Sequence, residues 1–160
     1  MAQIRDYERD FVTRTQALLR DYKGEYKLSN AINCMLGLIV LPNEMLERSH
    51  NLIWELPITE IAELNYLRIK VFEPVKKKRR DEIEYFPKTL QILLKKVRNG
   101  LAHQNILPIN TNGIFTGVSI RNYYGEGRGK ILDLEIEFDR RELERFAFFI
   151  SEKYLEPNDF

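Results

Sequence analysis

The segment KKVRNGLAHQN, residues 95–105, brings together three side chains suited to proton transfer and phosphate binding. On a helix, Asn99 and His103 are four residues apart and share a face, while Arg98 flanks the histidine. An imidazole can take or give a proton near neutral pH, and a guanidinium offers a fork of donors that fits phosphate oxygens. Asn99 can orient the imidazole or a substrate hydroxyl. These groups are sufficient to cut RNA without a metal.

The same spacing also fits a simple helix ending. Arg98 and His103 would complement the negative end of the helix dipole, and an Asn-Gly pair is common at turns. The residues alone leave both interpretations open. No cluster of metal ligands is evident in the sequence, and we expect neither a metal nor a cofactor.

The number of histidines bears on how a site could be completed. Cleavage needs an acid and a base in one transition state, but the only other histidine, His50, lies in the irregular segment ERSHN and is interpreted as a surface residue. Two chains could supply two motif histidines. The sequence therefore predicts a symmetric homodimer in which the Arg98–His103 helices face each other across a two-fold axis.

Composition places the chain among ordinary globular proteins. It has 160 residues, with 25 basic and 24 acidic side chains, so an anionic partner must meet a local basic patch. Cys34 is the single cysteine and lies in an apolar run, so we expect it to be a small hydrophobic residue of the core. The N-terminus lacks the apolar core of a signal peptide, and no run is long enough to span a membrane. We expect a cytoplasmic protein.

Periodicity places the motif within a helical framework. Apolar spacing predicts helices over residues 3–22, from Ser29 to Pro42, over 87–103 and over 139–154, the second being apolar nearly all round. Residues 71–87 have loop composition. Alternation predicts one β-hairpin at about 113–138, between the motif helix and the C-terminal helix. The expected fold is mainly α, an antiparallel bundle of four to five helices in a single domain over 1–160.

Two basic segments are candidates for RNA contact. The first is the run Lys76, Lys77, Lys78, Arg79 and Arg80, whose alternative is a solvated loop neutralised by the DEIE segment that follows. The second is the hairpin tip, where rings could stack on bases and cations could bind phosphates. Its alternative is a flexible tip whose charges prevent edge aggregation. The tip residues are Arg121, Tyr123, Tyr124, Arg128 and Lys130.

The RNGLAH stretch resembles the R-x4-6-H motif of the HEPN superfamily, in the form where a polar residue, here Asn99, follows the arginine. The runs NCMLGLIVLPNE and RNGLAHQNILP, with the hairpin and helix that follow, look like a small single-domain branch known from bacterial chromosomes and plasmids. The similarity extends from about residue 11 to residue 154.

This resemblance implies a metal-independent endoribonuclease that dimerises through the motif helix. Arg98 would bind and polarise the phosphate, Asn99 would orient the catalytic groups, and His103 would transfer protons. The expected activity cuts single-stranded or loop RNA to 2′,3′-cyclic phosphate and 5′-hydroxyl ends, in a toxin with an antitoxin partner or in an antiphage effector. The alternative is a non-catalytic HEPN module that binds RNA, a nucleotide or a partner protein.

Overall fold

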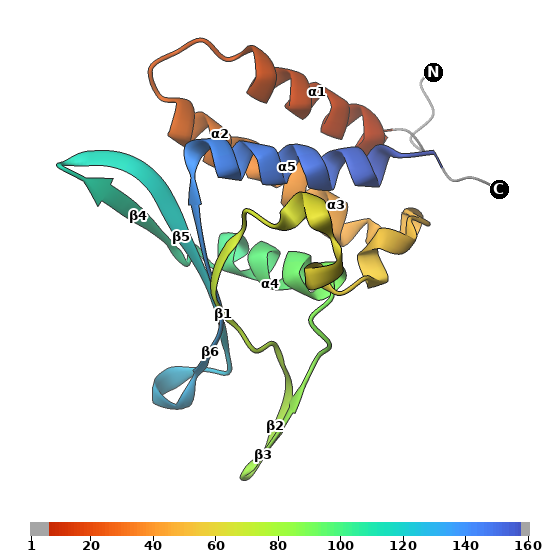
Figure 1. Cartoon of the computed structure of the whole chain (residues 1–160), viewed down its shortest axis with the longest axis vertical. Coiled ribbons are helices and arrows are strands. Elements are labelled where there is room, and N and C mark those ends of the chain that lie inside the picture. The colour runs from red at the N-terminus through yellow and green to blue at the C-terminus, as the bar shows by residue number, and fades with distance from the viewer. Residues whose placement is uncertain (1–6, 158–160) are drawn as a thin grey trace. The chain divides into compact units, whose positions relative to one another are not determined.

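A computed structural model describes residues 7–157 (Figure 1). The chain divides into two compact units. The helical unit comprises Met1–Asn51 and Arg140–Phe160, and the sheet unit comprises Leu52–Asp139. Residues 3–6 of the first predicted helix lie outside the described part. The single domain over residues 1–160 stays a prediction.

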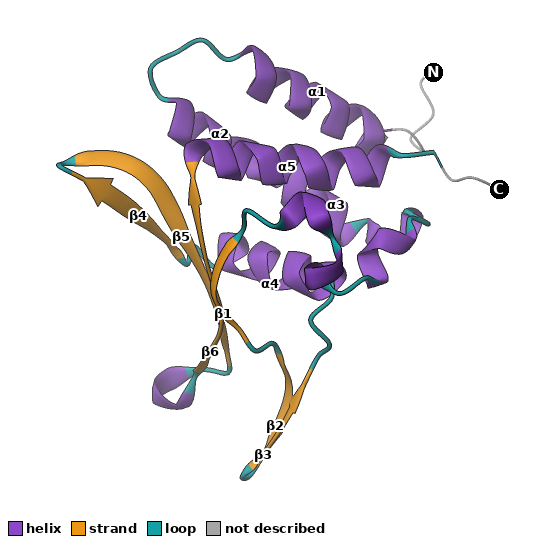
Figure 2. Cartoon of the chain, in the orientation of Figure 1, coloured by secondary structure: helices purple, strands orange, loops and turns teal. Residues whose placement is uncertain are grey.

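The helical unit contains α1 (Tyr7–Asp21), α2 (Lys27–Met35), α3 (Leu41–Glu44) and α5 (Arg140–Leu155). A π-helical segment, Leu36–Val40, joins α2 to α3, so the predicted second helix is continuous but irregular. In Figure 2, α1 runs alongside α5. Gln16 of α1 donates a hydrogen bond from Nε2 to Ser151 Oγ of α5 at 2.8 Å. The two amphipathic helices thus share one buried face.

The predicted enclosure of the second helix is only partly right. Cys34 is buried as expected, and burial together with the charge of Glu144 raises the pKa of its thiol. Leu36, however, is 61% exposed, so one face of this apolar segment is open in the described structure. An apolar composition all round does not require that every face finds a neighbour.

The prediction of a mainly α bundle with one hairpin is wrong, because the sheet unit makes this an α+β fold. Its antiparallel sheet has four strands in the order β1-β6-β5-β4. The predicted hairpin exists as β5 (Ile114–Tyr124) and β6 (Ile131–Asp139), but these strands form the centre of the sheet. Strands β1 (Arg68–Phe72) and β4 (Ile106–Thr111) flank them.

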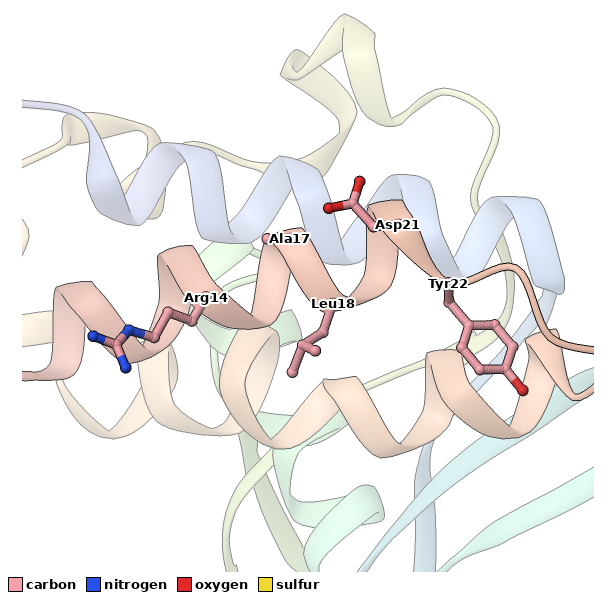
Figure 3. Close-up of a pocket in the computed structure, with 5 residues that line it drawn as sticks. All are labelled: Arg14, Ala17, Leu18, Asp21 and Tyr22. Atoms are coloured by element: carbon pink, nitrogen blue, oxygen red, sulfur yellow. The ribbon is translucent and has the colours of Figure 1, made fainter.

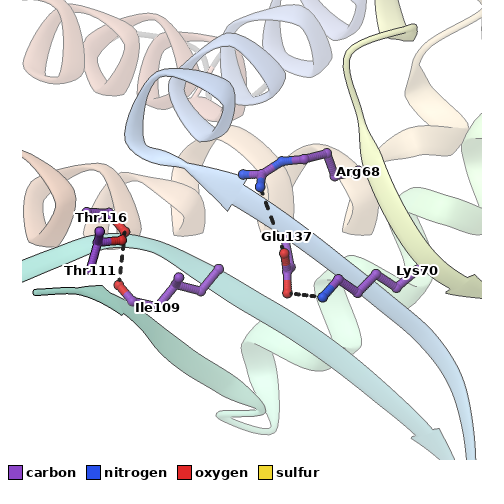
Figure 4. Close-up of polar contacts among 6 residues, drawn as sticks. All are labelled: Arg68, Lys70, Ile109, Thr111, Thr116 and Glu137. Atoms are coloured by element: carbon purple, nitrogen blue, oxygen red, sulfur yellow. Dashed lines mark hydrogen bonds and ion pairs between the residues drawn. The ribbon is translucent and has the colours of Figure 1, made fainter.

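Local signals for the flanking strand β4 are weak but present. Asn112 and Gly113 have φ values of 51° and 80°, and they link the paired residues Thr111 and Ile114 as a two-residue hairpin turn. Pro108 interrupts the pattern of β4, but proline is tolerated there because β4 is an edge strand. Figure 4 shows the threonine pair of this hairpin, whose Oγ1 atoms lie 3.0 Å apart.

Strand β1 pairs with β6 across a large sequence separation. Lys70 Nζ lies 2.7 Å from Glu137 Oε1, and Arg68 Nη1 lies 3.9 Å from Glu137 Oε2 (Figure 4). These pairs sit on a partly exposed face and add specificity of register more than stability. Because the partner strand is distant in sequence, only the tertiary fold identifies β1.

Residues 71–87 are also not a loop. They contain the end of β1 and a second sheet of two strands, β2 (Val75–Arg79) and β3 (Glu82–Tyr85). Opposite charges face each other in this pair, Lys77 opposite Glu84 and Arg79 opposite Glu82. Cross-strand charge pairing therefore takes the place of the apolar alternation by which strands are usually recognised.

Helix α4 (Leu90–Ala102) packs against β5 inside the sheet unit and carries the motif. The Thr89 side chain accepts a hydrogen bond from Ile92 N at 3.4 Å, so the cap follows the predicted Pro87 start by two residues. The predicted apolar stripe is confirmed, with Leu90, Leu93, Leu94 and Val97 fully buried. Over residues 7–157, no helix combines the length and apolar character that a membrane span requires.

Candidate active site

The end of α4 has a defined capping geometry. His103 is the C-cap, and Gln104 follows in the left-handed region with φ 56°. Asn105 N donates to Gly100 O at 2.8 Å and Gln104 N donates to Leu101 O at 3.2 Å, which is the double hydrogen bond of a Schellman motif. A non-glycine residue in this conformation costs roughly 1 kcal/mol. The backbone around His103 is therefore held by the cap.

Gly100 is required by packing rather than by a turn. A Cβ atom at this position would lie 2.6 Å from the backbone oxygen of Arg121 and 2.7 Å from Cγ2 of Ile120. Only glycine allows α4 to approach β5 this closely. The Asn99-Gly100 pair is thus inside the helix, and the helix ends three residues later than an Asn-Gly turn would place it.

The three predicted catalytic residues lie on this last part of α4. Arg98 Nη1 donates to Asn99 Oδ1 at 3.0 Å, and both side chains are half-buried. The predicted partner of Asn99 was the imidazole or a substrate, whereas its carbonyl oxygen here orients the guanidinium. His103 is exposed, and its backbone N donates to Asn99 O at 2.9 Å. The arrangement places a half-buried cation and an exposed imidazole on the last part of the same helix.

A buried ionic network anchors the same helix. Lys96 Nζ lies 2.8 Å from Asp133 Oδ2, and the two side chains are 6% and 0% exposed. Asp133 Oδ1 accepts from Asn122 Nδ2 at 2.7 Å, and its Oδ2 accepts from Val75 N at 3.2 Å. Lys96 also donates to Val75 O at 3.2 Å. The network joins α4 to β2, β5 and β6, directly upstream of the motif.

The sequence does not reveal this network, because Asp133 stands between Leu132 and Leu134 at a polar position of the alternating pattern, which is typical of an exposed side chain. The available signal was Lys96, which interrupts the apolar stripe of α4 between Leu93 and Val97. A charge on a buried stripe requires a partner of opposite charge, because an isolated buried charge is too costly. That argument predicts a buried carboxylate but does not say which one.

The five cations predicted to contact RNA from the first segment, Lys76 to Arg80, are all exposed on β2 and its turn. Arg80 occupies the turn with φ 50°. The hairpin tip has a different character. Arg128 is exposed in a short helical turn, and Tyr124 is half-buried.

Other members of the tip set contact one another. A hydrogen bond with Tyr123 and the charge of Glu135 raise the pKa of Arg121. Arg121 Nη2 lies 3.5 Å from a Glu135 oxygen, and Lys130 Nζ lies 4.3 Å from the centre of the Tyr123 ring. Because side chains alternate along β5 and Ile120 faces α4, Arg121 lies on the opposite face of the sheet from the motif.

The helical unit carries a hollow along α1 that offers little chemistry. It is lined by Arg14, Ala17, Leu18, Asp21 and Tyr22 (Figure 3). Arg14 already pairs with Asp10 at 2.9 Å, and the rest of the lining is largely apolar. Among residues 7–157, no group of three or more His, Cys, Asp and Glu side chains is placed to hold a metal ion.

Comparison with known proteins identifies the family. A family model described as HEPN pEK499 p136 matches residues 1–159, which include α4 and its motif segment. No curated protein and no solved structure matches the chain. The family match covers nearly the whole sequence and points to a nuclease or RNA-related function in general. The chain therefore belongs to this HEPN family.

Proposed function

We propose that this protein is a metal-independent endoribonuclease that acts as a homodimer on single-stranded or loop RNA. The observation that carries the proposal is the end of α4, where Arg98 and Asn99 are hydrogen-bonded and His103 is exposed at the C-cap. Membership in a HEPN family supports an RNA-directed activity. A toxin or antiphage role would suit such an enzyme.

The chemistry follows from the groups. A base removes the proton of a ribose 2′-hydroxyl, and the 2′-oxygen attacks the adjacent phosphorus. The guanidinium of Arg98, oriented by Asn99 Oδ1, stabilises the charge that develops on the phosphoryl oxygens. An acid protonates the 5′-oxygen as its bond to phosphorus breaks. The products are a 2′,3′-cyclic phosphate and a 5′-hydroxyl, and unpaired RNA is preferred because its ribose can rotate into line.

The experiment for this proposal is cleavage of a defined single-stranded RNA in excess EDTA. Wild-type protein should cut the RNA at an undiminished rate, because no step uses a metal. The 5′-hydroxyl of the products should accept phosphate from a polynucleotide kinase without prior dephosphorylation. The 3′ end should resist extension by a polymerase until the cyclic phosphate is removed. Binding of the RNA without any cleavage would instead select a non-catalytic module, and cleavage only with added Mg²⁺ would contradict the mechanism.

The dimer in the proposal has a separate test. If each site uses two His103 side chains, one from each chain, a mixed dimer with His103→Ala protein has an incomplete site. After subunit exchange with an approximately tenfold excess of the variant, activity per wild-type chain should fall about tenfold. Unchanged activity per wild-type chain would show that each chain acts alone.

A further inference from the structure

A cluster of cations surrounds one aromatic ring beside the motif. Lys76 Nζ, Lys95 Nζ and Lys96 Nζ lie 5.9, 4.9 and 5.7 Å from the centre of the Phe86 ring. Lys96 is buried in the ion pair with Asp133, whereas Lys76 and Lys95 are exposed. Phe86 therefore brings an exposed ammonium from β2 and another from α4 to the same place.

This cluster lies upstream of the motif on the same helix. Lys95 precedes Asn99 by four residues and Arg98 by three, so along the helix axis it lies about 6 Å from Asn99 and about 4.5 Å from Arg98, at an angle between theirs. Gln91 and Ala102, which share this line of the helix, are exposed as well. An extended ligand that contacts Arg98 can thus continue along α4 to Lys95 and Lys76.

We propose that Lys76 and Lys95, held over Phe86, form a subsite that binds the phosphates of single-stranded RNA flanking the scissile bond. This inference rests on the proposed function, because it extends the substrate away from Arg98. The proposed subsite includes Lys76 of the basic run on β2 but excludes Lys77 and Arg79 of the same strand. Within the described residues, Lys76 and Lys95 meet at the Phe86 ring, whereas Lys77 and Arg79 stand opposite Glu84 and Glu82 in the register of β2 and β3 without forming an ion pair with them.

The choice of RNA phosphate follows from the chemistry of the cluster. Two ammonium groups without a bound carboxylate attract an anion, and compact point charges suit phosphate contacts that do not read sequence. Glu84 and Glu82 stand in register opposite Lys77 and Arg79, and their negative charge lowers the positive potential there, so the contribution of these two cations to anion binding is smaller.

The test measures binding of a fluorescent 2′-O-methylated single-stranded oligoribonucleotide to the full chain. This probe lacks the attacking hydroxyl, so the result does not depend on whether the protein cleaves RNA. Each lost phosphate contact should reduce the slope of log K against log salt concentration by about 0.7. Lys76→Ala/Lys95→Ala should therefore reduce this slope by about 1.4 and weaken binding about 25-fold at about 0.1 M salt. The charge-preserving pair Lys76→Arg/Lys95→Arg should restore most of the affinity.

The matched control is Lys77→Ala/Arg79→Ala, which removes the same number of positive charges, both of them from the strand that carries Lys76. It should weaken binding less than about threefold, because only long-range attraction is lost. Equal losses for the two double variants would overturn the subsite and leave only a general basic surface. Unchanged binding by Lys76→Ala/Lys95→Ala would overturn it too. Circular dichroism should show that all three double variants fold as the wild type does.

Discussion

Replacing His103 by alanine should reduce RNA cleavage by about 10²–10⁴-fold, the range found when a general acid or base is removed. The side chain is exposed, and the cap at the helix end uses only backbone groups of this residue. The variant should therefore keep the melting temperature of the wild type while losing activity. Single-turnover cleavage of a labelled RNA, followed on a denaturing gel, measures the rate.

His50→Ala is the matched control for that experiment. It makes the same substitution at the only other histidine, which is also exposed, and it belongs to the helical unit rather than to α4. Its cleavage rate should equal the wild-type rate. If His103→Ala cleaves as fast as the wild type, or if both variants are equally impaired, His103 has no part in proton transfer.

Lys96→Met should destabilise the protein by about 3–5 kcal/mol, because it leaves the carboxylate of Asp133 buried without its cation. Asp133 is 0% exposed and would keep only its bonds from Asn122 and Val75. The loss is large because neither water nor another described cation reaches the group. Urea denaturation followed by circular dichroism gives the free energy of unfolding.

Lys95→Ala provides the control for this loss, since it removes a neighbouring lysine from the exposed side of the same helix. It should change the free energy of unfolding by less than about 0.5 kcal/mol. The double variant Lys96→Met/Asp133→Asn should lose less than the sum of its single variants, because the second change removes the stranded charge. Strict additivity, or a Lys96→Met protein as stable as the wild type, would show that the ion pair does not hold α4.

The two predictions concern different parts of helix α4, its motif end and its buried attachment to the sheet. The network around Lys96 attaches α4 to three strands, Gly100 lets the helix approach β5, and the Schellman bonds end it at His103. The motif residues are thus carried on a helix whose position, closest contact and end are each determined by a specific interaction. Such a fixed helix would supply the preorganisation that the proposed phosphate-cleaving site requires.

Much of this could be read from local pattern. Apolar spacing along 87–103 predicted the motif helix, and alternation predicted β5 and β6, because both signals come from residues that are neighbours in the chain. The RNGLAH stretch in its context also led to the HEPN family, which the family model shows. The roles of Arg98, Asn99 and His103 stay predictions.

The α+β character of the fold lay beyond those signals. Strand β1 is recognised only by its pairing with β6, and β2 and β3 replace apolar alternation with facing charges. These strands are stabilised by pairing with their partners and lack an apolar periodicity of their own. The composition of residues 71–87, taken as a single segment, therefore predicts a loop.

The sequence by itself determined which chemical groups stand at the end of one helix and which family the chain resembles, since residue type and spacing are local properties. Tertiary structure alone decided that Asp133 is buried against Lys96, that Gly100 touches β5, and that Lys76 meets Lys95 at Phe86. Each of these contacts joins residues from separate elements, and its contribution to the free energy of folding depends on how deeply the residues are buried. Burial is a property of the packed chain, and no single segment carries it.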